Sequence, residues 1–208
     1  MAPHAAETEK EYRVAEQIIP AANSAAWLKK YYLVRGLFSV AWVGAAVALG
    51  RENAPIAMGL LIAYPAWDAI ANYVDAMRSG GLSRSPSQAF NVVVSVLTTI
   101  AVAVTIGRSM NHVLAVFAAW ALLAGILQLA TGVRRRKYER GQWAMILSGA
   151  QSTTAGFFFL KESLAPAVPS ITSIAPYAAF GAFYFLLSAA LLARAGRRET
   201  GAASISRK

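Results

Sequence analysis

The residues best suited to chemistry in this sequence are a few ionisable and amide side chains inside otherwise apolar stretches. Asp68, Asn72 and Asp75 are spaced by four and then three residues, so a helix would place all three on one face. Arg35 is the matching cation in an earlier apolar stretch. Ionisable side chains at membrane depth are costly, and they mark functional candidates. We therefore expect a polar layer in which Arg35 forms an ion pair with Asp68 or Asp75.

Two glutamines extend this candidate intramembrane cluster. Gln128 and Gln151 fall at a similar predicted depth in two later apolar stretches. One interpretation is a path for protons or a solute. The other is purely structural, because amide side chains often link membrane helices by hydrogen bonds worth about 0.6 kcal/mol on average. Both interpretations stay open from the sequence.

A second candidate site is a run of four cations that follows the fourth apolar stretch. The run comprises Arg134, Arg135, Arg136 and Lys137. Basic side chains beside an anionic leaflet each contribute about 1 kcal/mol of attraction. The run therefore predicts contact with anionic lipid, and its alternative role is only to orient the chain in the membrane.

Motifs for other kinds of chemistry are missing from the sequence. The chain has no cysteine, which removes disulfides, thiolate metal sites and cysteine nucleophiles together. His4 and His112 are too far apart to form a local metal motif. There is no phosphate-binding glycine-rich loop. We expect no metal, no cofactor and no enzymatic activity.

Six apolar stretches must position the candidate residues. The chain is 57% hydrophobic and 14% charged, whereas a soluble domain is about 25% charged. Each stretch is near the roughly 20 residues that a bilayer requires, and lipid forces such spans to be helical. We predict an all-α membrane protein with six transmembrane helices, arranged as three helical hairpins, near residues 31–49, 54–76, 90–106, 112–133, 143–160 and 174–195.

The distribution of positive charge predicts the topology. Of the 20 Lys and Arg residues, all but Arg51, Arg108 and Lys161 fall on one predicted side of the membrane. Positive charge collects on the cytoplasmic side, so both termini should be cytoplasmic. The net charge of +10 is then a topology signal, and we expect no nucleic-acid partner.

We divide the chain into three parts. Residues 1–26 form a soluble N-terminal arm, rich in glutamate and alanine, that is either partly an amphipathic helix or disordered. Residues 27–195 form the six-span transmembrane domain, and residues 196–208 form a basic cytoplasmic tail. Within the membrane domain, Ser148, Ser152 and Gly156 are four residues apart, which is the spacing of small residues at packed membrane helices.

One segment of the chain carries a recognisable pattern. Trp120, Gly125 and Gln128 lead to the basic residues from Arg134, and a Gln-Trp pair, then Leu147-Ser148-Gly149 and Gly156, follow. This pattern resembles the HdeD-like acid-resistance membrane proteins, a short-repeat membrane family of unknown function. The resemblance extends over about residues 28–195, where Arg35-Gly36 and Asp68 also fit. The long N-terminal arm and the third stretch depart from the pattern.

The resemblance implies a six-span protein of the bacterial inner membrane linked to acid resistance or envelope stress. The leading interpretation is a non-enzymatic integral membrane protein that supports such tolerance. One alternative is a small proton or solute channel or transporter that uses Asp68 and Arg35, and another is an accessory subunit of a larger membrane complex. The expected partners are the lipid bilayer, anionic lipid, and either a second copy of the chain or a subunit of such a complex.

Overall fold

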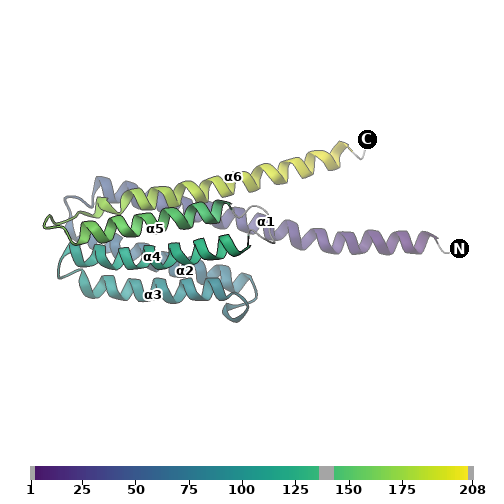
Figure 1. Cartoon of the computed structure of the whole chain (residues 1–208). Coiled ribbons are helices and arrows are strands. Elements are labelled where there is room, and N and C mark those ends of the chain that lie inside the picture. Colours follow the sequence, from purple (N-terminus) through teal and green to yellow (C-terminus); the bar gives the residue numbers. More distant parts are fainter. Residues whose placement is uncertain (1–2, 136–142, 206–208) are drawn as a thin grey trace. The chain divides into compact units, whose positions relative to one another are not determined.

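The computed structural model describes the backbone of residues 3–135 and 143–205, and the side chains of residues 26–130, 133 and 146–196. Over these residues the chain is helical (Figure 1), with six long helices and two short 3-10 helices between them. The long helices are α1 (Pro3–Ala48), α2 (Ala54–Arg78), α3 (Pro86–Thr105), α4 (Met110–Arg135), α5 (Trp143–Ser163) and α6 (Ala175–Ile205). The short ones are η1 (Leu82–Arg84) and η2 (Ile171–Ser173).

Five helical segments are long and apolar enough to cross a membrane. Among the residues described, they are Ala26–Ala48, Ala54–Arg78, Pro86–Thr105, Met110–Ala130 and Ile171–Gly196. The prediction of an all-α, multi-pass membrane protein is confirmed at this level. The fifth predicted span does form a helix, α5, but it is not among the five, and its centre from Gln151 to Thr154 is uniformly polar.

The ends of α2 follow local rules. Its first turn contains a proline, and the Asn53 side chain accepts a hydrogen bond from the Ile56 backbone N–H (3.1 Å), which caps the helix. The helix stops before Gly80 and Gly81, which both have a φ of +95°. Glycine tolerates this conformation at a helix end. The Gly81 N–H donates to the Ala76 carbonyl (2.8 Å), so the chain can turn directly into α3.

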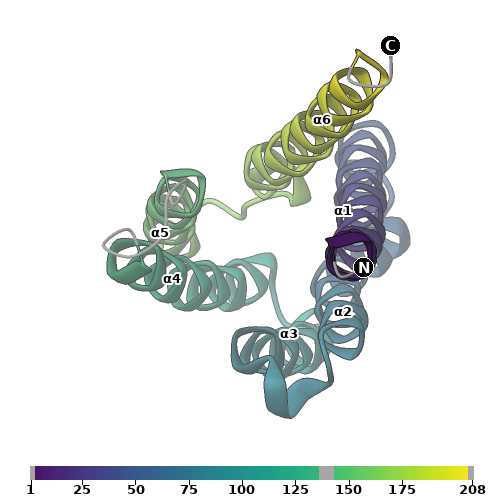
Figure 2. The ribbon, with the colours of Figure 1, turned by 90° about the vertical axis from the view of Figure 1, so that its right-hand side faces the viewer.

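The chain divides into two units, residues Met1–Phe38 with Gly181–Lys208, and residues Ser39–Phe180. In the second unit, the closest packing is between α4 and α5, followed by α2 with α3, while α3 touches α4 less (Figure 2). This grouping differs from the predicted hairpins, which joined the third span to the fourth. The physical reason is that glycines draw α4 and α5 together and polar side chains join α2 to α3.

The α4–α5 contact is a backbone-to-backbone contact. A Cβ added at Gly149 would lie 2.6 Å from the Leu129 backbone nitrogen, and one added at Gly156 would lie 2.7 Å from Leu122 Cγ. Thr153 of α5 lies against Gly125 of α4 in the same contact. The packed stripe of α5 is therefore Gly149–Thr153–Gly156, whereas the sequence predicted Ser148–Ser152–Gly156. Only Gly156 is common to both stripes.

An aromatic cluster forms the centre of the second unit. The Tyr64 ring of α2 lies 4.8 Å from Trp42 of α1 and 5.9 Å from Trp120 of α4. Trp120 also contacts Tyr177 of α6, at 6.3 Å between ring centroids. Tyr177 continues the cluster to Phe159 of α5. Tilted and edge-to-face ring contacts of this kind stabilise the core beyond the area that the rings bury.

Pro65 lies in this core, fully buried in the middle of α2. A proline has no N–H for the carbonyl four residues earlier, and its ring crowds the preceding turn. The Trp42 indole N–H donates to the Leu60 carbonyl in that turn (2.7 Å). The bond does not replace the one that Pro65 removes, which would go to the Leu61 carbonyl, but it ties α1 to the adjacent carbonyl of the same turn.

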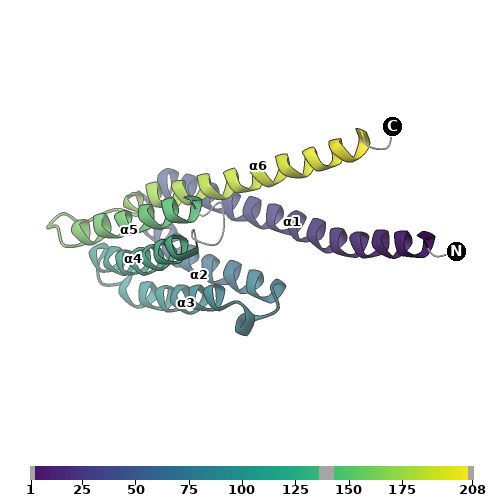
Figure 3. The same cartoon turned by 45° about the vertical axis from the view of Figure 1, so that its right-hand side comes forward.

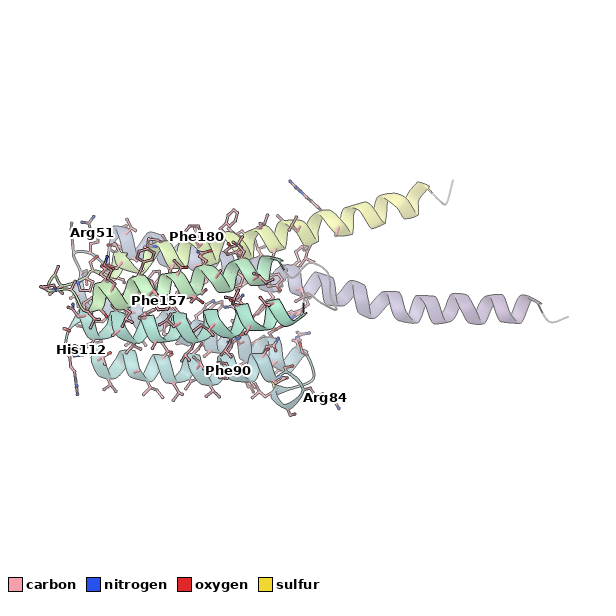
Figure 4. The ribbon with its side chains drawn as sticks, viewed as in Figure 1. Arg51, Arg84, Phe90, His112, Phe157 and Phe180 are labelled. Atoms are coloured by element: carbon pink, nitrogen blue, oxygen red, sulfur yellow. The ribbon has the colours of Figure 1, made fainter. Side chains whose placement is uncertain are left out.

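The outer face of α3 is apolar and exposed. Exposed side chains recur every three or four residues along it, as a helix face in contact with lipid would show, at Phe90, Val93, Leu97, Ile100 and Val104. Figure 4 shows that Arg51 and His112 lie at one end of this unit and Arg84 at the other. The apolar faces are therefore bounded by charge or a polar group at both ends.

The first unit consists of parts of two antiparallel helices, α1 and α6 (Figure 3). They approach closely at Gly36, where an added Cβ would meet Leu186 Cδ2 at 2.7 Å. Helix α1 is 46 residues long, so the predicted arm is helical from Pro3 and continuous with the first span. The division of the chain at residue 26 stays a prediction.

Candidate functional site

The candidate site is a polar cluster between α2 and α3, formed by Asp68, Asn72 and Ser95. Asp68 Oδ2 accepts hydrogen bonds from Ser95 Oγ (2.8 Å) and from Asn72 Nδ2 (3.0 Å). The same Asn72 amide nitrogen lies 2.8 Å from the Asp68 backbone carbonyl. Ser95 is 1% exposed and Asn72 is 7% exposed. A carboxylate thus lies among donors from two helices, inside two candidate spans.

Each of these side chains is positioned by its helix. Asp68 and Asn72 are one turn apart on α2, so the amide reaches back to the carboxylate. Ser95 belongs to the buried stripe of α3, which it shares with Thr98 and Val102. Thr98 satisfies its own hydroxyl through the Val94 carbonyl (2.8 Å). Ser95 is therefore the member of that stripe that reaches across to α2.

A second polar link joins the same two helices nearer their connecting loop. Gln88 Nε2, in the first turn of α3, donates to Asp75 Oδ2 (3.0 Å), near the end of α2. Asp75 is seven residues beyond Asp68 along α2, about 10 Å at 1.5 Å per residue. Carboxylates and hydrogen-bond donors thus line α2 and α3 from the loop to mid-span.

Arg35 is in the first unit and has aromatic neighbours. Its Nη1 donates to the Tyr31 hydroxyl (2.8 Å), and its guanidinium carbon lies 4.3 Å from the centroid of the Phe185 ring of α6. Stacking of this kind stabilises a cation, more so when it is partly desolvated. The predicted ion pair of Arg35 with Asp68 or Asp75 would join the two units, and it stays a prediction.

The remaining predicted residues lie on other helices. Gln128 is half-buried on α4 and Gln151 is half-buried on α5, the glycine-packed pair. Of the basic run, Arg134 and Arg135 complete α4, with side chains outside those described. Arg136 and Lys137 lie outside the described residues altogether. The predicted lipid contact of that run therefore stays a prediction.

Sequence reasoning missed Ser95, Gln88 and the aromatic surroundings of Arg35. Ser95 stands alone among valines, and a serine within such a run is a signal for a helix-to-helix hydrogen bond. Gln88 follows the turn at the start of α3 and gave no comparable signal. Phe185 depends on how α6 lies against α1, which spacing along the chain does not reveal.

Fold and site together define a multi-pass helical membrane protein with a polar cluster between two of its spans. Residues 90–161 match a family described as a short repeat of unknown function (DUF308). No curated protein and no solved structure matches the chain. The matched segment runs from α3 to α5 and contains the pattern from Trp120 to Gly156, so the short-repeat part of the predicted resemblance is confirmed there.

Proposed function

We propose that this chain is a non-enzymatic integral protein of the bacterial inner membrane that supports tolerance of acid or envelope stress. One observation carries the proposal. Gly125, Gly149 and Gly156, which belong to the HdeD-like pattern, are the residues at which α4 and α5 meet, and all three lie inside the short-repeat match. The likeness to HdeD-like proteins therefore rests on residues with a common structural role.

The proposal includes six membrane spans, which are the five candidate spans and α5. Support comes from how α5 runs beside α4, which is itself a candidate span. Gly149 lies against Leu129 near one end of α4, and Asn111 at the other end donates to the carbonyls of Ser163 (3.2 Å) and Ala165 (3.1 Å). From residue 111 to 129 a helix rises about 27 Å, close to the roughly 30 Å hydrocarbon core of a bilayer. This length of contact with a candidate span supports counting α5 as a span.

Cysteine labelling tests this topology, because the chain has no cysteine of its own. Single cysteines at Arg108 and Lys161 would be labelled with a membrane-impermeant maleimide in spheroplasts, with Ser79 and Arg84 as the opposite-side pair. If the chain has six spans and cytoplasmic termini, Arg108→Cys and Lys161→Cys should be labelled in intact spheroplasts. Ser79→Cys and Arg84→Cys should be labelled only after the membrane is permeabilised. If α5 does not cross, Lys161→Cys will behave like Ser79→Cys.

A deletion in the native host tests the stress function. We expect survival at low pH or under envelope stress to fall, and to recover with the intact gene. Gly149→Ala should fail to restore survival, whereas Gly59→Ala should restore it, because an added Cβ at Gly59 meets nothing within 4 Å. Protein levels are compared by immunoblot. Unchanged survival of the deletion strain under both stresses would refute the function.

A second candidate function is a proton path, which the Asp68 cluster favours. The Asp68 carboxyl can take up and release a proton, the Ser95 hydroxyl at hydrogen-bond distance can relay it, and the Asn72 amide can hold the carboxyl in place. Proteoliposomes with an internal pH dye and an imposed gradient would report flux. The path requires that Asp68→Asn abolish flux and that Glu52→Gln, which removes an exposed carboxylate in the loop before α2, leave it intact. Absence of flux in the intact protein would exclude the path.

A further inference from the structure

Among the side chains that the structure describes in the first unit, three cations are exposed and lie at a similar level. Lys29 and Lys30 are on α1 and Arg194 is on α6, and all three side chains are exposed. Lys29 and Lys30 directly precede the apolar stretch that starts near residue 31, and Arg194 lies at the close of the apolar stretch that ends near residue 195. Their position is therefore the boundary between hydrocarbon and headgroups.

The two helices bring these cations to one level. Gly36 and Leu186 mark the closest approach of the antiparallel pair. Lys30 is six residues before Gly36, and Arg194 is eight residues after Leu186. At 1.5 Å per residue the two cations lie about 9 Å and 12 Å from that approach, in the same direction.

Aromatic side chains occupy the same level. Trp27, Tyr31 and Tyr32 of α1 are half-buried, with ring centroids 6.1 Å apart for Trp27 and Tyr31 and 5.6 Å apart for the two tyrosines. Such residues are enriched at headgroup depth in membrane proteins. Arg35 lies against the Phe185 and Tyr31 rings, so of the cations described in this unit it is Lys29, Lys30 and Arg194 that are exposed.

Each cation also shares a helix face with exposed leucines. On α1, Leu33 and Leu37 are both exposed. They lie four and eight residues after Lys29, and three and seven residues after Lys30, which is helical spacing in each case. On α6, Arg194 is preceded at helical spacing by Leu191 and Leu187, also exposed. A cation above an apolar stripe matches one ligand chemistry, a phosphodiester headgroup with acyl chains below it.

We propose that the α1–α6 pair binds an anionic glycerophospholipid at the level of these three cations. The phosphodiester lies on Lys29, Lys30 and Arg194, and the acyl chains lie along the leucine faces. Its residues differ from those of the basic run after α4, and the proposal does not depend on the stress function. Two lipids of bacterial membranes combine phosphodiester headgroups with acyl chains in this way: phosphatidylglycerol, which has one phosphate, and cardiolipin, which has two.

Native mass spectrometry of the full chain, titrated with defined lipids, tests the proposal. The intact protein should bind phosphatidylglycerol or cardiolipin in preference to phosphatidylcholine. Each cation near an anionic headgroup contributes about fivefold, so K29Q/K30Q/R194Q should lower that preference at least about tenfold. The matched control R51Q/R108Q/K161Q removes three exposed cations elsewhere in the chain and should keep it. The anionic lipid that binds more tightly identifies the source.

Two outcomes would overturn the proposal. One is an intact protein with no preference for either anionic lipid over phosphatidylcholine. The other is an equal loss of preference in both triple variants, which would mean that net charge alone decides binding. Circular dichroism checks that each variant keeps its helicity. If K29Q/K30Q/R194Q does not fold, two other measurements replace it: lipid binding by R194Q, and lipid binding by the intact protein at rising salt. A lipid preference that changes neither in R194Q nor with salt contradicts the site.

Discussion

The α4–α5 pair and the α2–α3 pair hold two helices together by different means. Between α4 and α5, backbone lies against backbone at Gly125 and Gly149. Between α2 and α3, Ser95 donates to Asp68 and Gln88 donates to Asp75. The first contact has no room for an added atom, while the second depends on separate hydrogen bonds that can be lost one at a time.

This difference follows from the membrane as a solvent. Lipid tails are as apolar as leucine, so burying apolar side chains gives little drive for helices to associate. Close backbone approach, which gains van der Waals contact, and interhelical hydrogen bonds remain. Each pair relies mainly on one of the two, and the predictions below test whether their energies differ as their geometries do.

The largest effect is expected from Gly149→Ala. The added Cβ would lie 2.6 Å from the Leu129 backbone nitrogen, and a backbone atom cannot move aside as a side chain can. Overpacking of this kind costs about 1–3 kcal/mol, so we expect the free energy of unfolding to fall by the upper part of that range. Unfolding by detergent titration, followed by circular dichroism or fluorescence, would measure it.

Gly59→Ala is the matched control for this prediction, since it makes the same chemical change at an open position of α2. It should leave the unfolding midpoint nearly unchanged. Equal effects at Gly149 and Gly59 would mean that the close contact of α4 with α5 contributes nothing special.

The next effect is expected from Ser95→Ala. It removes one donor from the Asp68 carboxylate in a buried position. Interhelical hydrogen bonds in membrane proteins average about 0.6 kcal/mol and reach about 1.7, and the burial of Ser95 places this bond in the upper part of that range. We expect a loss of about 1–1.5 kcal/mol by the same unfolding assay.

Thr154→Ala serves as the control for Ser95→Ala. The Thr154 hydroxyl donates within its own helix, to the Ala150 carbonyl (2.9 Å), and the side chain is exposed. Its removal should change stability by less than about 0.5 kcal/mol. A loss at Ser95 no larger than at Thr154 would show that the Ser95–Asp68 bond does not join the helices energetically.

Gln88→Ala should have a smaller effect than Ser95→Ala. Gln88 is half-buried in the first turn of α3, where water can replace the bond to Asp75. We expect a loss of about 0.5 kcal/mol, the lower end for a hydrogen bond. Its exposed neighbour Ser87→Ala is the control, and a loss at Gln88 above that at Ser95 would reverse the proposed order along α2 and α3.

The positions of the spans could be predicted because bilayer thickness and hydropathy determine them. The predicted second span, 54–76, corresponds to α2 at Ala54–Arg78, and the third, 90–106, corresponds to α3 at Pro86–Thr105. Which face of a helix packs could not be predicted so well. On α5 the stripes that begin at Ser148 and Gly149 differ by about 100° around the helix, and both consist of small residues.

The candidate site was predictable in part for a related reason. Asp68 and Asn72 lie on one helix, and their spacing alone places them together. Ser95 comes from a second helix, so its contact with Asp68 depends on the register between α2 and α3. Hydrophobic periodicity identifies a buried face but not the height at which two faces meet, and the partner of Asp68 on α3 therefore needed the structure.

The smallest effect is expected from Gly44→Ala on α1. Nothing lies within 4 Å of a Cβ added there, so no clash opposes the change. In water, alanine stabilises a helix over glycine by about 1 kcal/mol. In a membrane the separated spans stay helical, because lipid offers no partner for free backbone groups, and the preference then acts on both states and cancels. We expect a change within about 0.3 kcal/mol in the unfolding assay, set against the large loss for the same substitution at Gly149. A gain near 1 kcal/mol would mean that the unfolded reference state loses helix around Gly44. The difference in unfolding free energy between Gly44→Ala and Gly149→Ala would then overstate the cost of the clash between α4 and α5.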